Sequence, residues 1–264
     1  MKKLHFTYDM QIAYSTEVSK CNFTIKCIPQ DTKRQTIENL KIDLLPPTRY
    51  QTGFDGFKNA QIYGVNFDEH RNFRFQIEGD VMTGLAPYEE GEDTNLSMVF
   101  SHPHGLNVAG ETILKFYDEN IEKIEKKATT TEQKATMMMH AINEAFAYQP
   151  CTTDVRTSAE EAFSQGCGVC QDYAHILIAL LHLEGISARY VTGFIMGEGQ
   201  SHAWVEYLDE GKWYGIDPTN NQKVNDDYIK IGHGRDANDC QINRGIMRGG
   251  GLHTQSVFVN VAEA

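Results

Sequence analysis

The segment from Cys170 to Leu183 constrains the fold of this chain most strongly, because its apolar residues cover most of the circumference of a helix. A helix of this kind is buried on most sides, so the rest of the chain has to supply elements that surround it. The loop Gly166–Val169 precedes the segment, and its glycines favour a turn just before the first helical residue. We therefore predict a central buried helix that begins at Cys170.

Cys170 lies at a position where a thiol becomes a strong nucleophile. The first turn of a helix has N–H groups without intrahelical partners and a partial positive charge, and both favour a thiolate over a thiol. The backbone N–H of Cys170 is also a candidate donor to the oxyanion of an acyl-transfer reaction. A buried structural cysteine is the alternative interpretation of this residue.

Two residues downstream complete a candidate catalytic triad. His202 supplies an imidazole and Asp217 a carboxylate, in a chain order that a thiol nucleophile can use. Residues 202–207 and 213–217 are predicted to pair as a hairpin. A two-residue turn at Glu210 and Gly211 places His202 diagonal to Asp217, and a four-residue loop would place the two directly opposite. In both registers the imidazole and the carboxylate share one face.

The same registers gather apolar side chains on the other face of the hairpin. A shift by one residue would separate His202 from Asp217 and would also break this apolar face. Burial and chemistry thus require the same register, which favours Cys170, His202 and Asp217 as the catalytic residues. The apolar face consists of Ala203, Val205, Tyr207, Tyr214 and Ile216.

The first eighty residues read as short β-rich runs separated by turn residues, a spacing typical of a β-sandwich. The composition changes at the acidic stretch that begins at Glu89. We predict an α+β protein with an N-terminal antiparallel β-sandwich over residues 1–84 and a catalytic core over residues 85–264. The predicted strands are Leu4–Ile12, Val18–Ile28, Thr36–Leu45, Ala60–Phe67 and Phe73–Val81.

The pattern becomes helical in the core. Apolar periodicity predicts helices over Thr112–Lys126 and Thr131–Tyr148, and the methionine-rich face of the second is typical of a packed core. Ser158 and Glu161 have capping-box spacing and predict a short helix that Gly166 ends. A strand over 188–196 follows the central helix, and the glycine-rich loop 197–200 is predicted to form a mobile rim of the site.

Other residues compete for chemical roles. His175 and His182 lie on the helix of Cys170, but neither shares its face, so structural roles suit them better. Cys167 and Cys170 form a CxxC pair that zinc or redox chemistry would use. A zinc site would need a second ligand pair of matching spacing, and thioredoxin-like motifs place the first cysteine at the helix start. We therefore predict no metal site.

Composition restricts the partners and the compartment. The net charge of −12 argues against binding to nucleic acid or to an anionic membrane. The six cysteines in 264 residues do not form the dense framework of a small secreted domain. The N-terminus reaches Asp9 before any signal-like apolar run develops, and no other run is long enough to span a bilayer. We predict a cytoplasmic protein with reduced thiols.

These motifs together resemble the bacterial transglutaminase-like superfamily of cysteine proteases. The resemblance rests on residues 168–174, 185–194, 202–206 and 217–220, and it extends to glycine-rich and arginine-containing motifs after residue 234 and to a final strand over Thr254–Val261. The first eighty residues resemble the β-sandwich that often precedes this core. The resemblance implies a papain-like core, with a central helix on an antiparallel sheet and Cys170, His202 and Asp217 as its triad. It also suggests Gln165 as a second oxyanion donor.

The fold and the triad do not select one reaction, because this fold carries several chemistries. The resemblance implies a cysteine protease or amidase that acts on a peptide or protein substrate through a thioester, with no metal or organic cofactor. Amine transfer to a protein glutamine, the reaction of a transglutaminase, is the alternative within catalysis. A non-catalytic binding or scaffold protein is the alternative outside it.

Overall fold

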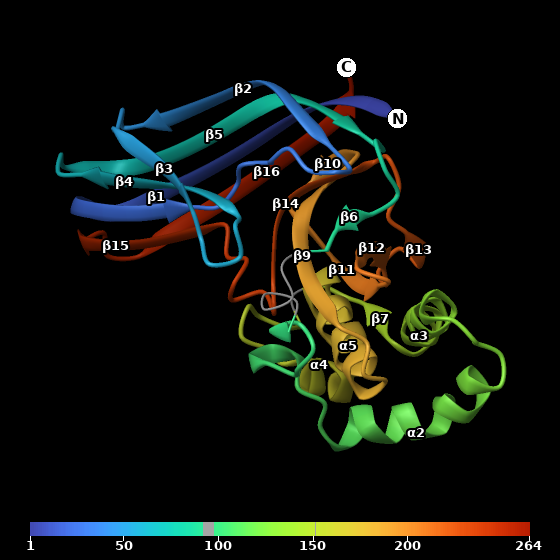
Figure 1. Ribbon diagram of the computed structural model, residues 1–264. Helices are drawn as coiled ribbons and strands as arrows, with labels where there is room; N and C mark the ends of the chain where they lie inside the picture. The colour runs from blue at the N-terminus through green and yellow to red at the C-terminus, as the bar shows by residue number, and fades with distance from the viewer. Residues whose placement is uncertain (92–97, 151) are drawn as a thin grey trace.

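The computed structural model describes residues 1–91, 98–150 and 152–264, in two large antiparallel sheets, a short parallel pair of strands and a layer of helices (Figure 1). The acidic stretch used to place the domain boundary is therefore described only as far as Gly91, and Cys151 lies outside the described residues. Both termini lie at the same end of the larger sheet, where the N–H of Ala264 donates to the carbonyl of Lys3 over 2.9 Å.

Helix α5 (Cys170–Leu183) is the central helix of the core, with the bounds that the sequence predicts. Ten of its residues are buried, from Asp172 to Leu181. Three further helices pack around it: α2 (Glu111–Glu125), α3 (Thr131–Ala145) and α4 (Ala159–Gln165), with a 3-10 turn η1 (Gly105–Asn107) nearby. The methionine face of α3 contributes Met138 and Met139 to this core, as expected.

A six-stranded sheet covers the other side of α5. Its strand order is β13-β12-β11-β9-β14, with β6 paired to β12, and all pairs are antiparallel. Ala203 and Val205 on β11 face α5, as the hairpin prediction requires. The strands are β6 (Glu89–Glu90), β9 (Ala188–Ile195), β11 (His202–Asp209), β12 (Lys212–Asp217), β13 (Gln222–Lys223) and β14 (Tyr228–Gly234).

The eight-stranded sheet is organised around one long strand, β1 (Lys2–Ile25), which pairs along both edges. Strands β4 and β5 follow one another along one edge, β15 and β16 along the other, and β2 and β3 lie outside β5 and β4. The remaining bounds are β2 (Thr36–Leu45), β3 (Tyr50–Phe54), β4 (Ala60–Asn66), β5 (His70–Thr83), β10 (Gly197–Gly199), β15 (Asn243–Gly249) and β16 (His253–Glu263).

The two sheets share a hydrophobic core. Alternate residues of β1 are buried, and Phe6 and Tyr8 stack on Phe194 of β9 with centroid distances of 5.6 and 5.8 Å. Ile229 and Ile231 of β14 join the same cluster. Because burying one such side chain contributes about 1.5–3 kcal/mol, this contact fixes the larger sheet on the six-stranded sheet.

Several elements differ from the sequence-based expectations. The predicted strands 4–12 and 18–28 are one strand with an irregular register between Ala13 and Val18, and β3 had not been predicted. The C-terminal strand, assigned to the core, pairs with β1 instead, so the larger sheet uses residues from both ends of the chain. The domain division after residue 84 stays a prediction.

The second predicted core helix ends three residues early, at Ala145. Ala147 and Tyr148 instead form a short parallel pair, β7, with β8 (Cys167–Gly168). This pairing attaches the residues that follow α3 to the loop that precedes Cys170.

Candidate active site

The loop before α5 is held by the first turn of the helix itself. Gly166 ends α4 in the left-handed conformation, with φ of 76°, as the sequence predicts. The buried carboxylate of Asp172 accepts hydrogen bonds from the Val169 N–H (2.8 Å) and the Thr153 hydroxyl (2.7 Å). A Cβ on Gly168 would lie 2.4 Å from this carboxylate, so only glycine fits there. Cys170 is thereby placed at the first helical position.

His202 and Asp217 meet across the hairpin. The His202 Nε2 lies 2.7 Å from the Asp217 Oδ2, within hydrogen-bonding distance. Val205 pairs with Ile216 and Asp209 with Lys212, which is the register of the two-residue turn at Glu210 and Gly211. The prediction that imidazole and carboxylate share one face is therefore confirmed.

Asp217 is fully buried and held by several donors. Its Oδ1 accepts from the N–H groups of Thr219 (2.9 Å) and Asn220 (3.2 Å), and its Oδ2 accepts from the Asn220 side chain and the Tyr228 hydroxyl, both at 2.7 Å. Burial alone would raise its pKa. The bonds to His202, Tyr228 and Asn220 outweigh that effect and lower the pKa of the Asp217 carboxyl.

His202 links Asp217 to Cys170. Burial disfavours the charged imidazole, yet hydrogen bonds to Asp217 and Cys170 and the charges of both groups raise the pKa of His202 to about 10. Because Nε2 bonds to Asp217, Nδ1 is the nitrogen left for the thiol. An imidazolium at neutral pH beside a thiol at a helix N-terminus favours the thiolate.

Asp217 lies buried behind His202, whereas Cys170 and His202 line a cleft of about 440 Å³. Its walls include Tyr148, Met196 and Val259 in addition to Cys170 and His202. Residues 197–201 line it as well, so the predicted rim is in place, but Gly197–Gly199 form strand β10 paired to β16 rather than a free loop.

Gln165 is exposed at the end of α4 and does not line the cleft, which removes the support for a second oxyanion donor there.

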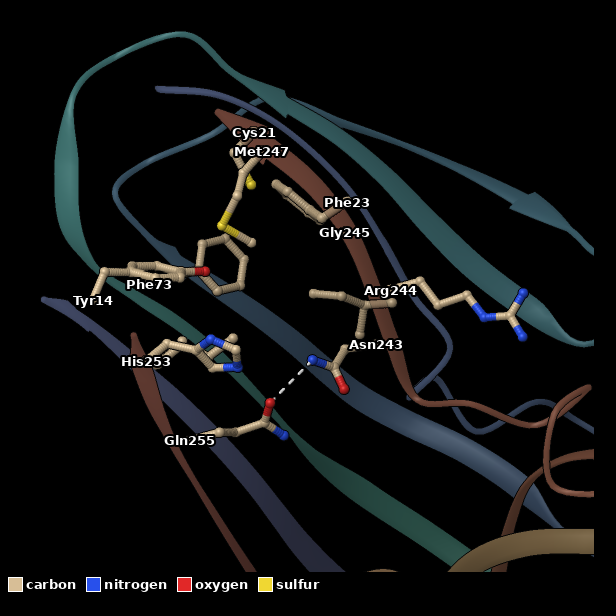
Figure 2. A pocket seen from close by; sticks show the side chains of 12 residues that line it. Tyr14, Cys21, Phe23, Phe73, Asn243, Arg244, Gly245, Met247, His253 and Gln255 are labelled. Carbon is tan, nitrogen blue, oxygen red and sulfur yellow. Dashed lines mark hydrogen bonds between the residues drawn. The ribbon is translucent and has the colours of Figure 1, made fainter. Parts of the chain in front are cut away.

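A separate cavity of about 220 Å³ lies on the larger sheet (Figure 2). It has an apolar interior that includes Phe23, Phe73 and Met247, and the Tyr14 hydroxyl points into it. The Arg244 side chain points away from this cavity, and no residue that lines it lines the cleft. The cavity is thus not part of the candidate active site.

The competing histidines have structural partners. The His175 Nε2 accepts from the Ala237 N–H over 3.1 Å, and burial lowers the pKa of His175 to about 3, so it stays neutral. The His182 Nε2 lies 2.9 Å from the Phe100 carbonyl. Within the described residues, no three His, Cys, Asp or Glu side chains are placed to hold a metal ion, and Cys167 and Cys170 are not bonded to each other.

Sequence reasoning missed two groups that position Asp217. Asn220 had a detectable signal, because Asx side chains and the N–H groups that follow an aspartate often form local turns. Tyr228 had none, since it comes from β14 and reaches Asp217 only through the folded sheet.

Replacing Tyr228 by Phe removes one donor to the buried carboxylate. Because a hydrogen bond to a charged group contributes about 1.5–3 kcal/mol, we expect Tyr228→Phe to lower the free energy of unfolding by that amount in urea at pH 7. Tyr50→Phe, at an exposed position on β3, serves as the matched control and should change little. Equal losses in the two variants would contradict the role assigned to the Tyr228 hydroxyl.

Two family models match this chain. Residues 119–218 match the transglutaminase-like superfamily, and residues 4–82 match the bacterial transglutaminase-like N-terminal region. The first segment contains Cys170, His202 and Asp217, and the second contains most of the strands of the larger sheet.

Known proteins of similar sequence include two from mycobacteria. An uncharacterised protein of Mycobacterium leprae is 39% identical over 124 residues, which span 43% of this chain and 44% of that relative. An uncharacterised protein of Mycobacterium tuberculosis is 27% identical over 273 residues, with 91% and 86% covered. The chain thus matches less than half the length of the first relative.

One solved structure resembles the whole chain. A proposed cysteine protease from Cytophaga hutchinsonii superposes with a TM-score of 0.81 at 20% identity, covering 99% of this chain and 90% of that one. At this identity the likeness establishes the fold. The predicted α+β class with a papain-like helix-on-sheet core is confirmed. The predicted N-terminal β-sandwich is not confirmed, because the strands of that region lie in one eight-stranded sheet. No helix among the described residues has both the length and the apolar character needed to cross a membrane.

Proposed function

Because the chain belongs to the transglutaminase-like superfamily, we propose that it is a thiol enzyme that cleaves a peptide or amide bond through a thioester on Cys170. The observation that carries this proposal is the contact of His202 with both Asp217 and the Cys170 thiol at the start of α5. The substrate is a peptide or protein segment, and the compartment is the cytoplasm, as composition and reduced thiols suggest.

In the first half of the reaction, the Cys170 sulfur attacks the carbonyl carbon of the scissile amide. A C–S bond forms, and the carbonyl electron pair moves to oxygen, where the Cys170 N–H stabilises the negative charge. His202, already protonated, gives its Nδ1 proton to the nitrogen of the leaving amine as the C–N bond breaks. A thioester and a free amine result.

In the second half, His202 acts as a base. It takes a proton from water as the water oxygen attacks the thioester carbonyl, and the C–S bond then breaks to return the Cys170 thiolate and an acid. Asp217 holds the ring in one orientation and balances the imidazolium charge throughout. In the alternative reaction, a primary amine replaces water at this step.

The fate of the thioester separates the two reactions. We expect the enzyme to release ammonia from glutamine-containing peptides at the same rate with and without millimolar glycine ethyl ester, and to form only the free acid. Mass spectrometry of the products measures both outcomes, with Cys170→Ala as the blank. A γ-glutamyl adduct of the amine as the main product would instead establish amine transfer.

A further inference from the structure

Strand β10 ends the eight-stranded sheet at the wall of the cleft. Its residues Gly197, Glu198 and Gly199 pair with Val261, Asn260 and Val259 of β16 along one edge. Within the described ranges, the opposite edge of β10 pairs with no other strand. The larger sheet therefore extends to the cleft that Cys170 lines, and its last edge stays open there.

An open edge carries hydrogen-bonding groups. In an antiparallel pair, successive residues direct their N–H and C=O alternately toward the partner strand and away from it. Either Glu198 or its two glycine neighbours therefore direct these groups away from β16. Unpaired edge groups of this kind are a template for an added strand.

The two glycines keep this edge accessible. They lie on the same face as Val259, which also lines the cleft. A Cβ on either would meet no atom within 4 Å, and only Gly197, with φ of 122°, has a backbone conformation that favours glycine. Neither packing nor backbone conformation therefore requires a glycine at position 199. A side chain at that position would, however, project over the cleft.

We propose that β10 binds the backbone of an extended polypeptide by β-strand addition, which presents the scissile bond to Cys170. The substrate class is then an unfolded or flexible protein segment, recognised through its main chain, rather than a small amide. This inference rests on the proposed thiol chemistry and adds to it the way in which the substrate is held. Main-chain hydrogen bonds supply the affinity in this binding mode.

The test compares electrophiles that carry the same chloromethyl ketone, from which the thiolate displaces chloride. One is a pool of acetyl-tripeptidyl ketones randomised at the two residues farthest from the ketone. The second is the same pool with N-methylated backbone nitrogens, and the third is the single-residue ketone. We expect the first pool to inactivate Cys170 at least about tenfold faster than the other two.

Two variants localise the effect. Gly199→Val should remove the advantage of the unmethylated pool, because its side chain projects over the cleft and obstructs the polypeptide that binds there. Gly56→Val, at another glycine whose added Cβ meets nothing within 4 Å, is the matched control and should keep the advantage. Thermal unfolding verifies that both variants are folded.

The outcomes distinguish this inference from the function it rests on. The rate at which iodoacetamide alkylates Cys170 in the wild type and in His202→Ala tests the thiol chemistry separately. If all three electrophiles inactivate equally fast while His202 still accelerates this alkylation, strand addition alone is overturned. An advantage that survives N-methylation or Gly199→Val would also overturn it, because the gain would then come from side chains. Loss of the His202 effect on iodoacetamide would instead refute the proposed thiol chemistry.

Discussion

Cys170 in the wild-type protein is expected to react with iodoacetamide at pH 6 about 100-fold faster than Cys170 in His202→Ala. An ordinary thiol with a pKa near 8.5 is only about 0.3% thiolate at this pH. A neighbouring imidazolium favours the thiolate form of a cysteine, and the gain in rate is smaller than the gain in thiolate because such a thiolate is intrinsically less nucleophilic. The ratio of the wild-type rate to the His202→Ala rate is therefore expected to be about 100.

The pH dependence of the same reaction tests the electrostatics. The pKa of His202 is raised to about 10, so its imidazolium persists through neutral pH and loses its proton only as the pH rises through that value. The wild-type alkylation rate should therefore vary little between pH 6 and 9. In His202→Ala the rate should rise steeply toward pH 8.5, as for a free thiol.

Mass spectrometry of tryptic peptides measures the rate at each cysteine, and Cys167 in the same loop is an internal control that His202→Ala should leave unchanged. A Cys170 that behaves as an ordinary thiol in the wild type would refute the proposed thiol enzyme. The non-catalytic binding protein would then be the better interpretation.

Local patterns were sufficient to predict the central helix and the hairpin. The apolar run that begins at Cys170 predicts α5 with its observed bounds, because the signal and the structure lie within the same fourteen residues. The register that joins His202 to Asp217 follows from a two-residue turn and one apolar face. The catalytic role of these residues stays a prediction, as does the domain division.

The parts that could not be predicted depend on residues far apart in the chain. Strand β10 contains two glycines in three residues, a composition with low strand propensity, and it is a strand only because β16 lies beside it. The same holds for β16 itself, whose partner β1 is at the other end of the chain. Propensity and periodicity contain no information about such pairs.

A buried charge cluster beside the site was likewise invisible in the sequence. The Glu206 Oε2 lies 2.7 Å from the Arg189 Nε and 2.6 Å from the Lys230 Nζ, and these groups come from three neighbouring strands of the core sheet. The side chains of Glu206, Arg189 and Lys230 are 1%, 2% and 11% exposed. The guanidinium also lies over the Trp213 ring, 4.3 Å from its centroid.

Replacing Glu206 by Gln is expected to lower the free energy of unfolding by about 3–5 kcal/mol, because two buried cations then face each other with one counter-charge fewer. Glu78→Gln removes the partner of Lys41 in an exposed pair and should change stability by less than about 1 kcal/mol. Lys230→Met in the Glu206→Gln background should recover part of the loss, which a double-mutant cycle in urea at pH 7 measures.

The stability that Glu206 contributes depends on pH. Burial raises the pKa of the Glu206 carboxyl, but Lys230 and Arg189 outweigh burial and lower it to about 2. The stabilisation from Glu206 is therefore fully present above the unfolded pKa near 4.5 and is lost as the pH falls through about 2. The difference between wild type and Glu206→Gln should accordingly shrink between pH 4.5 and 2. A difference below about 1 kcal/mol at pH 7 would mean that the cluster does not hold together the strands that carry His202.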